Sequence, residues 1–297
     1  MTDHLLNPLK LTRRSFLAMC LAGCSLAARR PQWPESPEHV WALVSDTHIS
    51  GLLDRSVRGS NMADNLAHVV EDIASAAPSQ VLFNGDLAYA RGEEADYAAF
   101  RRLVSPLWDS ATPVHLAVGN HDNRAGLLEA FSVATDPNVA DKAVSAVSVG
   151  GVDWLFLDSL EQGTLIRGSL GPQQLAWLAR ELDSSTAPAI VCLHHNPETS
   201  SLVGLKDAQE LIDIVLPRRR VKVLFFGHTH VFRIWQDDGL HFVNLPATGY
   251  RFFSPDVPLG WVRACMRINA MRLEFRGLTS RERGHGSLHD LSWRSDV

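Results

Sequence analysis

The sequence is poor in cysteine, and this shortage excludes a small domain held together by disulfide bonds. Only 4 of its 297 residues are cysteines, whereas disulfide-dependent folds are short and rich in cysteine. Cys192 and Cys265 lie in apolar runs that predict strands. No disulfide framework is therefore indicated.

Basic residues are also in short supply, with 28 Lys and Arg against 33 Asp and Glu and a formal net charge of −5. A protein that follows the phosphate backbone of a long nucleic acid needs a basic surface. The composition therefore excludes long nucleic acid as a partner. A small phosphate ester remains possible, because metal ions in a cleft would attract it.

Internal repeats and low-complexity tracts are missing from the sequence, which argues against a repeat architecture. Hydrophobic residues make up 45% and charged residues 21% of the chain, as in ordinary soluble globular proteins. A single large domain is the simplest organisation for this length.

The N-terminal stretch LTRRSFLAMCLAGC contains an apolar run that is too short to cross a bilayer comfortably. Its paired Arg13 and Arg14 resemble a twin-arginine export signal. The following LAGC resembles a bacterial lipobox, in which Cys24 is lipidated; the alternative is an ordinary cleavage site. We expect residues 1–23 to be the signal and residues 24–38 a tether. The protein would then be periplasmic or in the cell envelope, anchored by lipid.

Five apolar runs end in side chains that can bind metal ions. They are HVWALVSDTHIS with Asp46 and His48, VLFNGDLAY with Asp86, PVHLAVGNHD with Asn120, His121 and Asp122, AIVCLHHNP with His194 and His195, and VKVLFFGHTHVF with His228 and His230. In α/β folds, ligands gather outside the carboxyl ends of the strands. The five strand ends are therefore expected to converge on one site.

This ordered set of motifs (D-x-H, GD, GNHD, HH and GHTH) resembles that of the calcineurin-like metallophosphoesterases, over residues 39 to about 250. The segment RGEEADYAAFRRL resembles the bacterial branch of cyclic-nucleotide phosphodiesterases and glycerophosphodiesterases. GNHD in place of GNRD argues against the lipid-precursor pyrophosphatases. The resemblance implies an α/β fold, a four-layer αββα sandwich of two mixed β-sheets flanked by helices.

The resemblance also implies two metal ions that share the Asp86 carboxylate. One would be bound by Asp46, His48, Asp86 and His230, and the other by Asp86, Asn120, His194 and His228. All donors are oxygen or nitrogen atoms, which suit Mn, Fe, Zn or Co. Such a pair of ions supports hydrolysis of a phosphate ester by an activated water.

Residues beside the expected ligands are assigned supporting roles. The resemblance places His121 next to the leaving group as a general acid, and Asp122 is expected to orient it. His195 is expected to support the ligands without binding metal. Arg55 and Arg58, in the loop after the first strand, either contact the substrate or are solvated loop charges.

Tyr89 has two possible roles. Gly85-Asp86-Leu87-Ala88-Tyr89 matches the GD-x-x-Y spacing with which purple acid phosphatases supply a tyrosinate to ferric iron. Many bacterial relatives use no side chain from this position, and the sequence leaves both roles open.

Hydrophobic periodicity predicts the remaining elements. It predicts helices in NMADNLAHVVEDIASA, from Tyr97 to Trp108, in PQQLAWLARELD and in KDAQELIDIVL, and a hairpin that turns at Gly150-Gly151. GLHFVNLPATGYRFF and WVRACMRINAMRLEFRGL are both assigned to strands of a second sheet. Residues 280–297 are polar and contain glycine, so we expect a loosely packed tail after a domain over residues 39–279.

These features predict a dinuclear-metal hydrolase that acts on a small soluble phosphodiester such as a cyclic nucleotide or a glycerophosphodiester. Two alternatives remain: an exported phosphomonoesterase, and a metal-stabilised binding or sensor protein that has lost turnover. The sequence does not indicate an oligomeric state.

Overall fold

The computed structural model describes residues 39–295 except for 134, 165, 199–202 and 268. The export signal, the lipobox with Cys24 and the tether, all predicted for residues 1–38, lie outside the described residues. Among the helices of the described part, none is long and apolar enough to cross a membrane.

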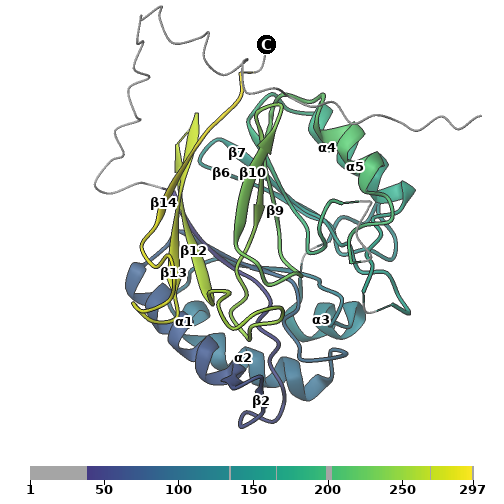
Figure 1. The fold of residues 1–297 in the computed structure, drawn as a ribbon. Helices are drawn as coiled ribbons and strands as arrows, with labels where there is room; N and C mark the ends of the chain where they lie inside the picture. The colour runs from purple at the N-terminus through teal and green to yellow at the C-terminus, as the bar shows by residue number, and fades with distance from the viewer. Residues whose placement is uncertain (1–38, 134, 165, 199–202, 268, 296–297) are drawn as a thin grey trace, which may run out of the picture. The chain divides into compact units, whose positions relative to one another are not determined.

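The first of two large sheets has six strands in the order β14-β13-β12-β1-β4-β5 (Figure 1). Their bounds are Val40–Val44 for β1, Gln80–Asn84 for β4, Val114–Ala117 for β5, Gly260–Arg267 for β12, Ala270–Gly277 for β13 and Leu288–Ser292 for β14. β1, β4 and β5 pair in parallel, so their carboxyl ends lie at one edge. β12 to β14 continue the sheet antiparallel to β1.

The second sheet also has six strands, in the order β10-β11-β9-β8-β7-β6. Their bounds are Ser145–Val149 for β6, Val152–Phe156 for β7, Ala189–Cys192 for β8, Val221–Phe226 for β9, Arg233–Asp237 for β10 and Leu240–Asn244 for β11. The four inner strands are parallel, and the edge strands β6 and β10 are antiparallel to their neighbours. A small separate hairpin is formed by β2 (Ser56–Val57) and β3 (Ser60–Asn61).

Five helices cover the outer faces of the two sheets. They are α1 (Met62–Ala76), α2 (Glu94–Asp109), α3 (Arg124–Phe131), α4 (Pro172–Asp183) and α5 (Ala208–Val215). One apolar cluster joins α1, α2 and α3 to the first sheet, and a second joins α4 and α5 to the second sheet. A third fills the space between the sheets. The predicted four-layer αββα sandwich is confirmed.

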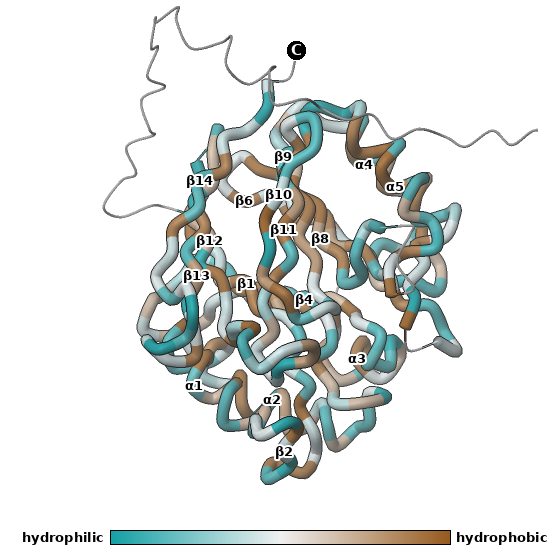
Figure 2. The backbone as a smooth tube through the Cα atoms, viewed as in Figure 1, coloured by the Kyte–Doolittle hydropathy of each residue, from teal (hydrophilic) through white to brown (hydrophobic). Residues whose placement is uncertain are grey.

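The central strands are apolar on both faces because each face packs against another layer. In β1, Trp41 and Leu43 face the other sheet, whereas Ala42 and Val44 face the helices. The indole rings of Trp41 and Trp154 stack across the sheet interface with centroids 3.8 Å apart. Figure 2 shows hydrophobic residues concentrated in the strands near β8.

The assignment of the later strands to one common sheet is wrong. β11 pairs with β9 in the second sheet, whereas β12 and β13 join β1 in the first. Alternating apolar residues predict a strand with one buried face but do not identify its partner, which tertiary packing decides.

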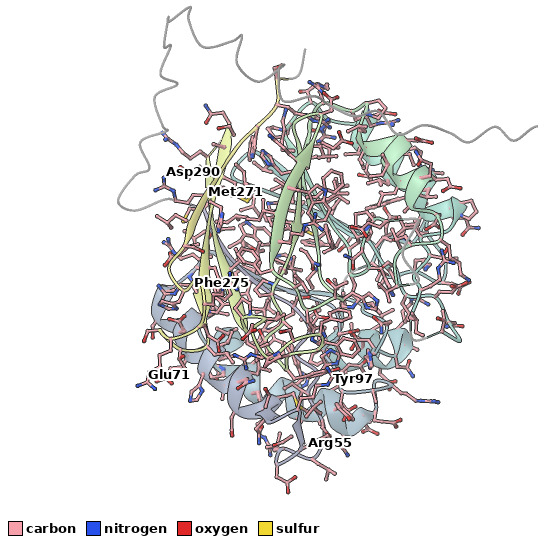
Figure 3. The ribbon with its side chains drawn as sticks, in the orientation of Figure 1. Arg55, Glu71, Tyr97, Met271, Phe275 and Asp290 are labelled. Atoms are coloured by element: carbon pink, nitrogen blue, oxygen red, sulfur yellow. The ribbon has the colours of Figure 1, made fainter. Side chains whose placement is uncertain are left out.

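The predicted loose tail at 280–297 is wrong as well. Residues 288–292 form β14 on the edge of the first sheet, and Figure 3 shows Asp290 on this strand. Asp290 pairs with Arg272, and Leu291 is buried. The Arg294 guanidinium is buried and donates hydrogen bonds to the carbonyls of Val215 and Leu216 at the end of α5. A polar segment can thus be well ordered when its charges satisfy backbone groups.

Candidate metal centre

The carboxyl ends of five strands meet at one place between the sheets. β1, β4 and β5 supply the residues after them from the first sheet, and β8 and β9 from the second. The structure brings together all seven predicted ligands: Asp46, His48, Asp86, Asn120, His194, His228 and His230. Six of them are at most 3% exposed, and His228 is half-buried.

Unusual backbone geometry aims these side chains. Five of the expected ligands are non-glycine residues with left-handed φ angles of 50 to 70°: Asp46, His48, Asp86, His228 and His230. Such conformations are uncommon and cluster where function requires them. The tight turns also require glycine: a Cβ on Gly85 would lie 2.6 Å from His194 Nδ1, and one on Gly227 would lie 2.6 Å from an Asp46 carboxylate oxygen.

Two carboxylates lie among the four imidazoles. Asp86 Oδ2 is 3.2 Å from His194 Nε2 and 3.6 Å from His48 Nε2. Asp46 Oδ1 is 3.4 Å from His230 Nε2 and 3.9 Å from His194 Nε2. Asp86 thus lies between the two groups of histidines, as a bridging ligand requires.

The hydrogen bonds of the ring nitrogens test whether this site fits a metal. Nδ1 of His230 is 2.7 Å from the carbonyl of Tyr250, Nδ1 of His194 is 2.9 Å from that of Asn84, and Nδ1 of His48 is 3.4 Å from that of Tyr89. A carbonyl only accepts, so each Nδ1 carries a proton, and Nε2 is the nitrogen through which each ring would bind a metal. This arrangement is typical of metal-binding histidines, and the residues therefore fit a metal.

The electrostatics of the site agree with this description. Burial lowers the pKa of His48 well below its usual value and that of His228 to about 3, so both rings are neutral. Burial opposes ionisation of Asp86, but His194 lowers the pKa of this carboxyl well below its usual range. Although burial acts in the opposite direction, Asp86 raises the pKa of His194 to about 10. Without a metal this ring is therefore protonated on Nε2 beside Asp86, and a bound cation would take the place of that proton. A buried anionic site of this kind needs cations for charge compensation.

Asp122 does not have the role expected for it. Its carboxylate accepts hydrogen bonds from the backbone N–H groups of Gly119, Leu87 and Ala88 at 2.8 to 3.1 Å. Among the described residues, no hydrogen bond joins it to the His121 ring. Asp122 therefore ties together the loops after β4 and β5. Burial and the neighbouring Asp86 raise the pKa of Asp122 to about 7. The three amide donors act in the opposite direction, because they stabilise the carboxylate anion.

His121 lies at the cavity, with its ring perpendicular to that of His48 at a centroid distance of 4.9 Å. Its backbone N–H donates to Asp86 Oδ1 at 2.8 Å, which fixes the position of its Cα. Its Nδ1 is buried and makes no hydrogen bond in the described part of the chain. Because the residue lines the cavity, its imidazole can contact a substrate bound there.

His195 is fully buried behind the ligands. The Ser159 hydroxyl accepts the N–H groups of His194 and His195 and is 2.8 Å from His195 Nδ1, to which it donates its proton. The His195 ring lies 4.6 Å from the His228 ring. The structure therefore places it beside a ligand, where the sequence predicted a supporting residue.

The arginines and Tyr89 lie on one side of the site. The Arg55 guanidinium lies 4.6 Å from the centre of the Tyr89 ring, and its Nε donates to Ser50. Tyr89 reaches His48 through its backbone carbonyl, and its side chain is not among the residues that line the metal cavity. Arg58 lies over the Phe252 ring at 4.7 Å.

Sequence reasoning missed Tyr250. Its ring lies 4.9 Å from the rings of both His48 and His230, and its carbonyl accepts the proton of His230 Nδ1. Burial and the carboxylate of Asp86 raise the pKa of its phenol to about 12. The sequence feature that could have indicated Tyr250 is the aromatic cluster TGYRFF directly after a strand. The sequence prediction includes this cluster in the strand.

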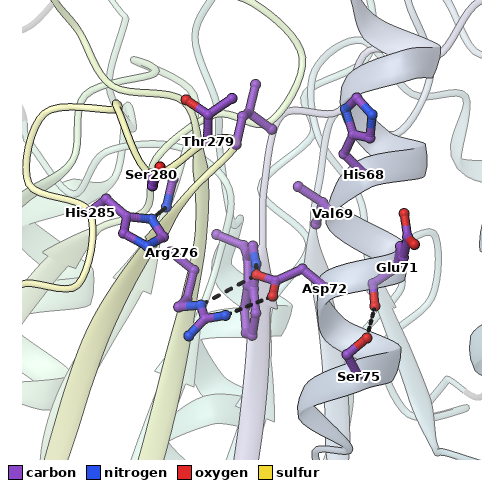
Figure 4. A pocket seen from close by; sticks show the side chains of 12 residues that line it. His68, Val69, Glu71, Asp72, Ser75, Arg276, Thr279, Ser280 and His285 are labelled. Carbon is purple, nitrogen blue, oxygen red and sulfur yellow. Dashed lines mark hydrogen bonds and ion pairs between the residues drawn. The ribbon is translucent and has the colours of Figure 1, made fainter.

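The expected ligands open into a cavity of about 210 Å³. Its lining residues are His48, Asp86, Asn120, His121, Ile166, Val203, His228, Thr229, His230, Tyr250, Phe252 and Phe253. A different pocket, of about 490 Å³, lies beside α1 (Figure 4). There the Asp72 carboxylate pairs with Arg276 and accepts a hydrogen bond from the Trp261 indole, so the charge of Asp72 is already compensated.

Comparison with known families shows to which family the chain belongs. The sequence model of the calcineurin-like phosphoesterases matches residues 41–232, which include every expected metal ligand. The chain belongs to this family. Calcineurin-like phosphoesterases of this kind are metal-dependent hydrolases of phosphoric esters, and the predicted enzyme class is confirmed.

Similar proteins include bacterial phosphodiesterases. The chain is 29% identical to a probable cyclic nucleotide phosphodiesterase of Synechococcus, over 74% of this chain and 84% of that protein. It is 31% identical to the 3',5'-cyclic adenosine monophosphate phosphodiesterase CpdA of Pseudomonas aeruginosa, over 70% of this chain and 76% of that protein. A dimetal phosphatase of Danio rerio shares the fold, with a TM-score of 0.69 over 87% of this chain and all of that one, at 15% identity.

Proposed function

We propose that this calcineurin-like phosphoesterase is a phosphodiesterase that hydrolyses a small diester of the cyclic-nucleotide type. The observation that carries the proposal is the buried cluster in which Asp86 lies between His194 and His48, at 3.2 and 3.6 Å. Relatives named as cyclic nucleotide phosphodiesterases, at about 30% identity, support this substrate class.

Two divalent ions fit the donor set, one beside Asp46, His48 and His230 and one beside His194 and His228, with Asp86 between them. When bound, such a pair supplies positive charge for the phosphoryl oxygens and makes water acidic enough to attack at neutral pH. The oxygen and nitrogen donors favour Mn, Fe, Zn or Co over thiophilic metals.

The chain's own residues perform the remaining steps. Asn120 lies at the bottom of the cavity, with its amide oxygen 3.1 Å from His194 Nε2. The His121 imidazole lines the same cavity. It donates a proton to the leaving oxygen as the P–O bond breaks, which is the role of a general acid.

Turnover by Mn-loaded protein tests the proposal. We expect hydrolysis of bis(p-nitrophenyl) phosphate and, among natural esters, faster hydrolysis of cyclic nucleotides than of glycerophosphodiesters or monoesters. Asp86→Asn should abolish both activities. Preferential hydrolysis of monoesters would contradict the proposed diester specificity, and no turnover with any ester would contradict the enzyme function itself.

We also propose export through the twin-arginine pathway with a lipid anchor at Cys24, on the basis of the TRRSFL and LAGC stretches. Replacement of Arg13 and Arg14 by lysine should keep the protein in the cytoplasm. Cys24→Ala should give an exported protein that is released from membranes. Normal export of the double lysine variant would contradict the pathway.

A further inference from the structure

Exposed apolar side chains gather around the mouth of the metal cavity. Among the described residues, the large hydrophobic side chains with high exposure are Leu52, Ile166, Phe252, Phe253 and Leu288. Three of these line the cavity: Ile166, Phe252 and Phe253, which are 55%, 42% and 61% exposed. Apolar surface kept beside a polar metal site indicates that part of the ligand is apolar.

Hydrogen bonds join the start of the segment that carries the phenylalanines to the metal site. Thr248 and Gly249 donate backbone hydrogen bonds to the carbonyls of Ser45 and Asp46, at 3.0 and 2.9 Å. The side-chain amide of Asn65 donates to the Gly249 carbonyl at 2.8 Å. Gly249 is needed for this close approach, because a Cβ there would lie 2.7 Å from the carbonyl of Thr47.

Aromatic rings continue from the metal ligands to the mouth of the cavity. The Phe252 ring lies 5.8 Å from the ring of His230 and 4.9 Å from the ring of Phe253. Arg58, from the turn between β2 and β3, lies over Phe252 at 4.7 Å, within cation–π distance. Phe252 is thus fixed between a metal ligand and a cation while a large part of it remains exposed.

We propose that Phe252, held by Arg58, is the residue against which the aromatic base of the substrate stacks while its phosphate lies at the metal ligands. This inference rests on the proposed function, because it assumes a phosphate ester that carries a nucleobase. A planar base suits this surface better than an aliphatic chain does, since both partners present aromatic faces and edges. Ile166 and Val203 supply an apolar wall for the same cavity.

Binding to metal-loaded protein tests the proposal without turnover. Adenosine 5'-monophosphate and ribose 5-phosphate share their phosphate and sugar and differ in the base. We expect calorimetry to show tighter binding of the nucleotide to wild type, and Phe252→Ala to weaken nucleotide binding about 5- to 100-fold. Binding of ribose 5-phosphate should remain within about twofold, since it makes no stacking contact.

Three further variants make the test specific. Phe252→Trp should retain the preference for the nucleotide, whereas Phe252→Leu, which is apolar but not aromatic, should lose most of it. Arg58→Ala should weaken nucleotide binding about two- to fivefold, as expected for an exposed cation–π contact. Leu288→Ala is the matched control, because Leu288 is 56% exposed but lies on β14, outside the cavity lining.

Several outcomes would overturn the inference: equal affinity of wild type for the two ligands, full base preference in Phe252→Leu, or an equal loss in Leu288→Ala. Failure of the proposed function has a different signature. If wild type hydrolyses no diester but still prefers the nucleotide in a manner that depends on Phe252, the phosphodiesterase proposal fails and the base-stacking inference stands.

Discussion

The Nε2 atoms of His48 and His230 lie 3.1 Å apart, and each ring has its other nitrogen against a backbone carbonyl. Two neutral rings with this tautomer cannot donate to each other through Nε2. The close approach of two lone pairs would become favourable with a cation held by these two rings and Asp46. The fold therefore holds an arrangement that is costly without metal.

Asp86→Asn is expected to remove both metal ions. Its carboxylate lies between His194 and His48, and an amide cannot bridge two cations with two anionic oxygens. Metal analysis of purified protein should give about two ions per chain for wild type and close to none for Asp86→Asn. Asn120→Ala should lose only the ion beside His194. Asp64→Asn, at an exposed carboxylate in the first turn of α1, is the control and should keep both.

The ligand set could be predicted from sequence because every ligand directly follows a strand or its turn. Parallel strands bring their carboxyl ends to one edge, so Asp46, Asp86 and His194 had to meet once the strands were recognised. The role of Asp122 could not be predicted in this way, because its partners are backbone amides of two loops. Strand partners across the two sheets also depend on long-range packing, and for that reason β11 was assigned to one sheet with β12 and β13, and β14 was predicted as a loose tail.

Arg294→Ala is expected to lower the free energy of unfolding by about 2–3 kcal/mol. The guanidinium is 7% exposed and donates to four carbonyls, those of Val215, Leu216, Arg218 and Val221. Its loss leaves buried acceptors without donors. Urea denaturation would measure the change, with Arg283→Ala, at an exposed position, as the control. Equal stability of the two variants would restore the view of residues 280–297 as a loose tail.

His115 is expected to make stability depend on pH. Its ring stacks on Trp41 and Phe156, and burial lowers its pKa from 6.5 to about 4. The neutral ring is favoured in the folded state, so this stabilisation is complete above pH 6.5 and is lost as the pH falls toward 4. Between pH 7 and pH 4.5, the free energy of unfolding should fall by about 1–3 kcal/mol less in His115→Phe than in wild type. The expected difference is kept modest because the ring is only half-buried. Urea denaturation at several pH values would measure this, and an equal fall in the free energy of unfolding for the two proteins would contradict the prediction.

Tyr89→Phe is expected to keep full metal content, because the phenol ring lies against Arg55 and does not line the metal cavity. Iron-loaded wild type should then be colourless in the visible range. A tyrosinate bound to ferric iron gives a visible charge-transfer band, so a purple wild-type protein whose colour disappears in Tyr89→Phe would establish the alternative role of this residue.

His121→Ala is expected to retain nearly full metal content and to lose turnover. The His121 imidazole lines the cavity, and general acid catalysis contributes about 10² to 10⁴ in rate. The loss should be largest for esters with poor leaving groups and smallest for p-nitrophenyl esters, since p-nitrophenolate departs without a proton. Rates across a leaving-group series would measure it, with His68→Ala, at an exposed histidine in the pocket beside α1, as the control. Loss of metal would show instead that His121 is a ligand, as its position near His48 and Asp86 permits. An equal fall for all leaving groups would exclude proton donation.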